Sequence, residues 1–153
     1  MEIDPTERQA RSSVAESREI DLARLGTVLK EFEQIEYAMA FGSASDGIVN
    51  VDSDVDVAVG FAPGQAPGFD VMAEMIGRIE DSFAVACDPT VLNTAGPVLA
   101  HEALKGRILF LRPACRENFV EFYVRTCAEF EDLMAWRKRQ LAYRGYECPS
   151  TAS

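Results

Sequence analysis

A glycine–serine turn and a pair of aspartates are the residues of this chain best suited to chemistry. Gly42 and Ser43 end one apolar run, and Asp54 and Asp56 begin the next one after ten intervening residues. Side chains alternate faces along a strand, so the two carboxylates point the same way, roughly 6.6 Å apart. Such a pair is favourable around a divalent cation, which takes oxygen ligands. Because Gly42 lets the backbone approach a phosphate and Ser43 adds donors beside it, the pattern suits a metal–nucleoside triphosphate.

Asp88 is the best candidate for a third carboxylate in such a site. It lies in the apolar run 83–92, where a buried charge is costly unless it is neutralised. Three clustered carboxylates without a cation would repel one another, and at least one pKa should rise. The simpler alternatives are that Asp88 and Pro89 start a turn, that the aspartate pair is a solvated strand entry, and that the Gly-Ser pair is an ordinary turn.

The elements that must position these residues follow from apolar periodicity. Apolar residues at helical spacing predict a helix over 18–34, and apolar runs predict strands over 35–41 and 55–61. A methionine-containing helix ends near Ser82, and its methionines are expected to fill the core. The remaining predicted elements are a strand over 83–92, which Pro89 makes an edge strand or bends, a short helix over 96–105, a strand over 107–111 and a long helix from Arg116 to about Tyr143.

This alternation predicts an α/β fold with a small mixed β-sheet packed by helices and a long C-terminal helix. The expected organisation is a poorly ordered segment or short helix over 1–17, one domain over 18–144, and a flexible tail over 145–153.

Composition narrows the class of protein. The chain has 153 residues and a formal net charge of −10, which argues against direct binding of a nucleic-acid backbone. Residues 1–10 are polar and acidic, and no apolar stretch approaches the ~20 residues that span a bilayer, so we expect neither a signal peptide nor a membrane span. The four cysteines lack metal-ligand spacing, which indicates reduced thiols and a cytoplasmic protein.

Residues outside the motif are less informative. His101, the single histidine, is expected to be a surface or partly packed residue rather than a catalyst. The basic run 137–139 is interpreted as a complement to the helix dipole. Trp136 and Tyr143 suit either the core or a partner surface.

The Gly42-Ser43 and Asp54-Val55-Asp56 motif, with Asp88 on a later strand, resembles the DNA polymerase beta-type nucleotidyltransferase superfamily. The short length and the segments 91–95 and 101–110 are similar to its minimal nucleotidyltransferase (MNT) antitoxins, which pair with HEPN-domain RNase toxins. The resemblance covers about residues 22–111 and implies the fold of that superfamily.

What the resemblance implies is an enzyme that transfers AMP from ATP to a tyrosine hydroxyl of a HEPN toxin, and so neutralises it. By position, Gly42 and Ser43 would hold the β- and γ-phosphates. Asp54 and Asp56 would bridge two Mg²⁺ ions, and Asp88 would complete one metal shell and help deprotonate the attacking hydroxyl.

The sequence departs from the family pattern at two points. Members often carry an arginine soon after the Gly-Ser pair, where this chain has Ala44-Ser45-Asp46-Gly47, and Pro89 directly follows the third aspartate. Two alternatives therefore stand beside the antitoxin enzyme. One is a small-molecule nucleotidyltransferase of the aminoglycoside type, and the other is a non-catalytic antitoxin that acts by binding alone.

Overall fold

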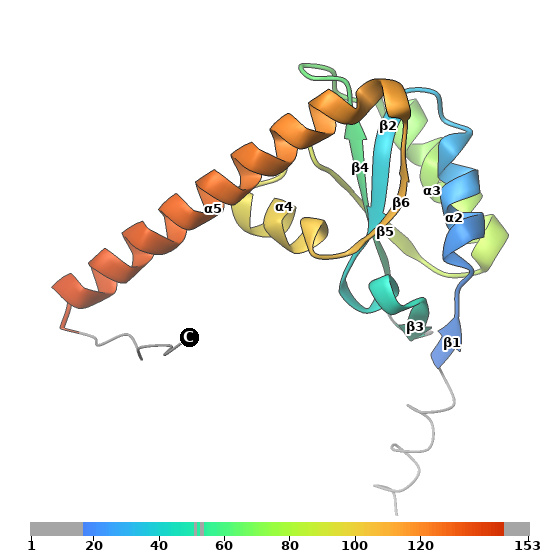
Figure 1. Cartoon of the computed structure of the whole chain (residues 1–153). Coiled ribbons are helices and arrows are strands. Elements are labelled where there is room, and N and C mark those ends of the chain that lie inside the picture. Colours follow the sequence, from blue (N-terminus) through green and yellow to red (C-terminus); the bar gives the residue numbers. More distant parts are fainter. Residues whose placement is uncertain (1–16, 51, 53, 146–153) are drawn as a thin grey trace, which may run out of the picture.

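A computed structural model describes residues 17–50, 52 and 54–145 of the chain (Figure 1). The elements in chain order are β1 (Ser17–Glu19), α2 (Leu22–Lys30), β2 (Ile35–Ala40), the 3-10 helix η1 (Gly42–Asp46), β3 (Ile48–Asn50), β4 (Val55–Phe61), α3 (Phe69–Phe83), β5 (Cys87–Val91), α4 (Pro97–Leu104), β6 (Arg107–Leu111), the 3-10 helix η2 (Pro113–Cys115) and α5 (Arg116–Tyr143).

The central sheet is mixed, with the strand order β5-β4-β2-β6. β2 runs antiparallel to β4 and β6, while β4 and β5 are parallel. This confirms the predicted α/β class with a small mixed sheet. Pro89 lies in β5, which is an edge strand as the sequence requires. Val55 N–H donates to the Ala86 carbonyl and Leu92 N–H to the Val59 carbonyl, so the even-numbered residues of β5 bond to β4 and the Pro89 nitrogen faces the free edge.

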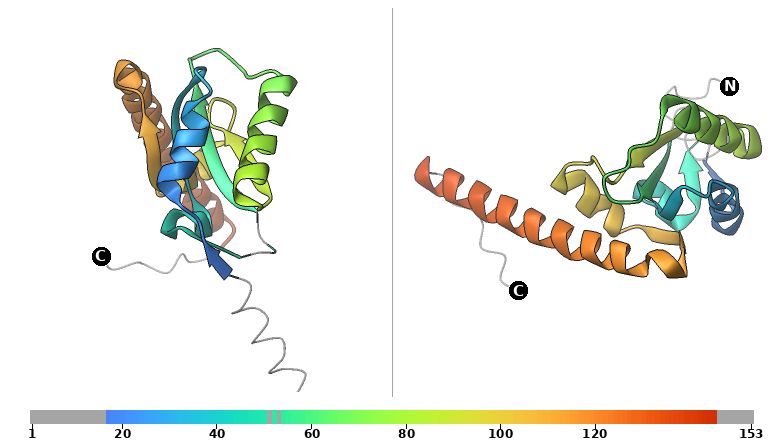
Figure 2. Two further views of the ribbon diagram at one scale, coloured as in Figure 1. Left: turned by 90° about the vertical axis from the view of Figure 1, so that its right-hand side faces the viewer. Right: turned by 90° about the horizontal axis from the view of Figure 1, so that it is seen from above.

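Helices cover both faces of this sheet (Figures 1 and 2). Successive residues of β2 alternate between the two faces. Ala38 and Ala40 pack in the core that α2 and α3 complete, whereas Tyr37 and Met39 pack with residues of α4 and α5. On the first face, Met75 of α3 is fully buried, in agreement with the expected core role of the methionines.

The N-terminal helix is shorter than predicted. The Asp21 carboxylate caps α2 by accepting from Arg24 N–H at 3.2 Å, so the helix begins at Leu22 and ends at Lys30 rather than spanning 18–34. Residues 17–19 instead form β1, which pairs antiparallel with β3. Both strands are short and draw their stability from each other, which periodicity along the chain does not reveal.

The third predicted strand also starts later than expected. α3 continues through Phe83 and ends at Ala84, whose φ of 51° is left-handed, and β5 begins only at Cys87. The Arg18 guanidinium donates to the carbonyl oxygens of Phe83, at 2.7 Å, and Ala84. These bonds satisfy carbonyls that the end of the helix leaves free, and they tie β1 to α3.

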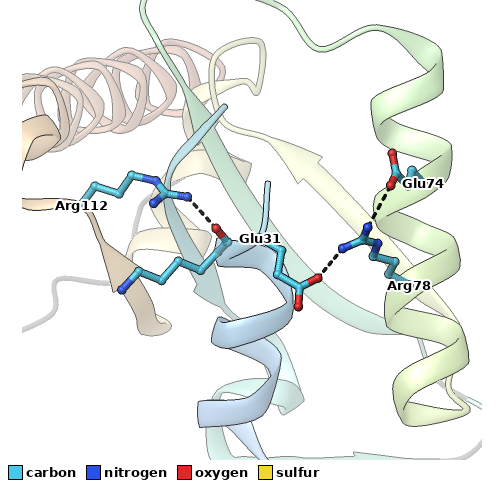
Figure 3. A network of polar contacts seen from close by, with 5 residues as sticks. Glu31, Glu74, Arg78 and Arg112 are labelled. Atoms are coloured by element: carbon cyan, nitrogen blue, oxygen red, sulfur yellow. Dashed lines mark hydrogen bonds and ion pairs between the residues drawn. The ribbon is translucent and has the colours of Figure 1, made fainter. Parts of the chain in front are cut away.

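Two arginines join the elements at the other end of the sheet (Figure 3). Arg112, directly after β6, donates through Nε to the Ile35 carbonyl at 2.7 Å and through Nη2 to the carbonyls of Lys30, at 2.8 Å, and Phe32, at 3.1 Å. Arg112 therefore fixes the connection between α2 and β2 against β6. Nearby, Arg78 of α3 contacts a carboxylate at the end of α2 and one on its own helix (Figure 3).

The long C-terminal helix has the predicted extent, Arg116–Tyr143. Its first half packs on the sheet and α4, and its second half projects beyond the body of the molecule (Figures 1 and 2). The predictions for residues 1–16 and for the tail after Gly145 fall outside the described residues. In the part of the chain that the structure describes, no helix is long and apolar enough to cross a membrane.

Candidate active site

The parallel pairing of β4 and β5 brings the three candidate aspartates together. Asp56 and Asp88 are Cα partners in this ladder, and residues in register on neighbouring strands point to the same face. Asp54 precedes Asp56 by two residues at the start of β4, so it lies towards the same face. Asp54 and Asp88 are exposed and Asp56 is half-buried. The structure thus gathers all three at the N-terminal ends of two adjacent strands.

Gly42 lies directly against Asp56. Phe41 N–H donates to the Asp56 carbonyl at 3.0 Å, which holds the end of β2 beside β4. Gly42 then turns the chain with a left-handed φ of 63°, and a Cβ at this position would lie 2.8 Å from Asp56 Oδ2. Only glycine fits this turn without displacing the carboxylate.

Ser43 is exposed at the start of η1, and among the described residues its hydroxyl has no hydrogen-bond partner. The neighbouring Ser45 hydroxyl instead closes the turn, because it donates to the Gly42 carbonyl at 2.8 Å. The predicted phosphate-binding pair therefore presents a free hydroxyl beside the carboxylates.

The charges of the two neighbouring aspartates act on Asp56. Burial raises the pKa of Asp56 above its usual value, and the charges of Asp88 and Asp54 raise it further. Cys87, the first residue of β5, has its pKa raised to about 12 by burial, by Glu80 and then by the three aspartates. Its thiol stays protonated, so it is not a nucleophile of this site.

Residues 12–114 match the family "Polymerase beta, Nucleotidyltransferase". The chain belongs to this nucleotidyltransferase family. No curated protein matches its sequence. The carboxylates and the Gly-Ser turn thus lie inside the segment that this nucleotidyltransferase shares with its family.

Solved structures show the same fold at low sequence identity. A chain of a toxin–antitoxin structure with AMP-PNP aligns with a TM-score of 0.65 and 20% identity, over 80% of this chain and 97% of that one. A chain of the structure of a tri-AMPylated Shewanella oneidensis HEPN toxin in complex with its MNT antitoxin aligns with a TM-score of 0.60 and 19% identity, over 79% and 92%. A MntA–HepT toxin–antitoxin structure gives a TM-score of 0.59 and 18% identity, over 79% and 93%.

The donor set of this nucleotidyltransferase fits a hard divalent cation, since all three side chains offer carboxylate oxygens. Within the described residues, however, no three His, Cys, Asp or Glu side chains converge on a ready-made metal site. Burial first, and then the charges of Asp88 and Asp54, raise the pKa of Asp56. A bound cation would offset the repulsion among these three charges.

Glu80 is a residue near the site that the sequence reasoning missed. Its carboxylate accepts from Cys87 N–H at 3.5 Å, which links α3 to the first residue of β5, next to Asp88. No local pattern could have identified it, because the contact depends on how α3 returns to the sheet.

Other singled-out residues lie away from the carboxylates. The His101 ring of α4 stacks on Phe130 of α5, with ring centroids 3.7 Å apart and planes 2° apart, so it is a partly packed residue as predicted. A cleft of about 500 Å³ lies at the opposite, C-terminal ends of β4 and β5, where it is lined by Tyr37, Asn93 and residues of α5. Trp136 and Tyr143 are exposed on α5 rather than in the core.

Proposed function

We propose that this chain is a Mg²⁺-dependent nucleotidyltransferase antitoxin, which transfers AMP from ATP to a tyrosine hydroxyl of a HEPN RNase toxin and so neutralises it. The observation that carries the proposal is the register of Asp56 and Asp88 beside the Gly42 turn, within a chain of the nucleotidyltransferase family. The partner is supported by the fold, which is shared with chains of toxin–antitoxin structures, among them one with AMP-PNP and one with an AMPylated HEPN toxin.

The reaction needs few groups from the protein. The acceptor hydroxyl oxygen attacks the α-phosphorus of ATP, the bond from that phosphorus to the pyrophosphate oxygen breaks, and pyrophosphate leaves. Asp88, exposed at the edge strand, accepts the proton of the attacking hydroxyl. Gly42 leaves room for the β- and γ-phosphates, and the free Ser43 hydroxyl donates to them.

Asp54, Asp56 and Asp88 would together hold Mg²⁺, which when bound neutralises the carboxylates and the triphosphate. Without a cation the three carboxylates repel one another, and this repulsion adds to burial in raising the Asp56 pKa. A calorimetric titration with ATP tests this requirement. ATP should bind with Mg²⁺ and poorly with EDTA, and equal affinities would contradict the metal-dependent site.

Transfer to the partner tests the activity itself. Asp54→Asn with Asp56→Asn removes two charges with little change in volume, so labelling of the purified toxin by radioactive ATP should fall by about 10³-fold or more. Asp81→Asn is the matched control, because Asp81 is an exposed carboxylate of α3 and should leave labelling unchanged.

The same variants separate catalysis from binding alone. If the doubly substituted protein protects cells from the toxin as well as the parent does, the antitoxin acts by covering its partner. Labelling of an aminoglycoside but not of the toxin would favour the small-molecule enzyme instead.

A further inference from the structure

The outer face of α5 is a surface that the candidate active site leaves unused. Phe122 and Thr126 of this helix are buried against the body. Residues two positions away point about 200° from them, and therefore away from the body. The residues on this outer face are Val120, Val124, Cys127, Glu131, Ala135, Lys138 and Ala142, spaced three or four apart.

The outer face of α5 is apolar near the start of the helix and charged further along it. Val120 and Val124 are 49% and 61% exposed near the start of the helix. Further along, Glu131 and its neighbour Asp132 are acidic, and Lys138 and its neighbour Arg139 are basic. All four charged residues are exposed, and none forms an ion pair within the described residues.

The helix dipole does not account for this order of charges. Its effect is confined to the first and last turns of a helix. The last turn of α5 contains no basic residue, and Glu131 and Asp132 lie in the middle of the helix. The interpretation of the basic run as a complement to the dipole is therefore wrong for this helix.

The two charged pairs are related by a simple symmetry. Glu131 and Arg139 lie four residues on either side of Ala135, and Asp132 and Lys138 lie three residues on either side. A second α5 that runs antiparallel and crosses at Ala135 would place each acidic residue opposite a basic one, twice over. A parallel second helix would place like charges together.

We propose that two copies of this chain form a homodimer through the outer faces of their α5 helices, packed antiparallel about Ala135. The contact is isologous, since the acidic pair of each copy meets the basic pair of the other. The small side chains of Ala135 and Ala142 allow a close approach of the helices, and Cys127 supplies apolar area. Any partner helix must present basic residues opposite the acidic pair and acidic residues opposite the basic pair. An antiparallel second copy of α5 meets this requirement by symmetry.

The charge of the distal half of α5 favours a second copy of this chain as the partner, rather than any other acidic protein surface. Residues 133–145 carry four basic residues and no acidic one, which leaves a net charge of −14 on the rest of the chain. This basic segment thus projects beyond an acidic body (Figure 2), where it can reach the acidic part of another α5.

Sedimentation velocity of the full chain, without any partner, tests the proposal. The parent should be a dimer at about 50 μM, and Lys138→Glu with Arg139→Glu should raise the dissociation constant at least tenfold. Glu131→Lys with Asp132→Lys should do the same. The four substitutions together keep the net charge of the parent and should restore its dissociation constant within about threefold. An equimolar mixture of the two doubly substituted proteins should form heterodimers.

Circular dichroism shows whether each variant keeps its helix content, which exposed positions should allow. A monomeric parent at about 100 μM, or a fourfold variant that stays monomeric, would overturn the proposal. If the charge reversals leave the parent's oligomeric state unchanged but weaken capture of the purified HEPN toxin, the face belongs to the toxin interface and the homodimer is wrong.

Discussion

Gly42 and Gly64 have similar left-handed backbones, with φ of 63° and 77°, but only Gly42 lies against a candidate functional side chain. An alanine at either position costs about 1–2 kcal/mol of backbone strain. At Gly42 its methyl group would also meet Asp56 Oδ2 at 2.8 Å, whereas at Gly64 it meets nothing within 4 Å.

Gly42→Ala and Gly64→Ala should therefore lose similar stability but differ in activity. A displaced carboxylate can cost about 10²-fold in rate, so Gly42→Ala should lose that much transfer while Gly64→Ala keeps near-parent transfer. Single-turnover labelling and thermal melts of both variants make the comparison. Equal activities would show that the approach of Gly42 to Asp56 does not position the site.

Asp56 gives stability a definite pH dependence in the absence of metal. Its folded pKa is raised, so its contribution to stability is fully present below the unfolded value near 3.8 and is lost as pH rises through the folded value. Asp56→Asn should remove this loss and raise the neutral-pH melting temperature in EDTA, by about 2–4 °C for each kcal/mol gained.

Melts of the parent and of Asp56→Asn from acid to neutral pH test this sign. The two curves should converge at acid pH and separate as the parent ionises. Added Mg²⁺ should stabilise the parent more than the variant. A variant that is less stable than the parent in EDTA at neutral pH would contradict the repulsive cluster.

At the scale of the elements, Tyr37 of β2 depends on a neighbouring glycine of β4. A Cβ at Gly60 would lie 2.2 Å from the Tyr37 ring, which is 4% exposed and packs edge-on against Phe119 of α5 at 5.0 Å. Gly60→Ala should destabilise the protein by about 1–3 kcal/mol because the ring must move.

Gly77→Ala is the matched change in α3, where an added Cβ meets nothing within 4 Å. In a helix interior it should stabilise by about 0.5–1 kcal/mol. Urea unfolding of both variants separates the effects of packing and of backbone. A neutral Gly60→Ala would mean that the sheet and α5 yield easily at this contact.

Much of this architecture was predictable from local pattern. Apolar runs predicted β2 and β4, and Pro89 predicted an edge strand or a bent one, of which the structure shows the edge strand. β1 and β3 were missed because each has three residues and forms only by pairing with the other, about 30 positions away along the chain.

The candidate site, too, was predictable from the sequence only in part. Residue spacing alone predicted that Asp54 and Asp56 lie on one face of a strand and that the Gly-Ser pair lies beside them. The alignment of Asp56 with Asp88 depends on the register of two parallel strands joined through α3, which no spacing in the sequence fixes. The roles assigned to these residues remain predictions that the substitutions above test.

At the scale of the whole molecule, the distal half of α5 stands apart from the folded body. Trp136 is the single tryptophan of the chain, is 53% exposed, and lies on this projecting segment (Figure 1). It is one residue beyond Ala135 but turned about 100° from it, and it lies on the side of the helix opposite Cys127 and Lys138. The proposed dimer therefore leaves its indole in water.

The emission maximum of Trp136 should consequently change little when the body unfolds. As urea is added, far-ultraviolet circular dichroism should show a cooperative transition, while the Trp136 emission maximum should stay close to that of a water-exposed indole. Phe122→Trp is the control, because Phe122 is 7% exposed against the sheet and a tryptophan there should shift to the red as the body unfolds. A large cooperative red shift of the parent's own tryptophan would show that the distal half of α5 is covered in solution, and would contradict both its projection from the body and a dimer that uses only the outer face.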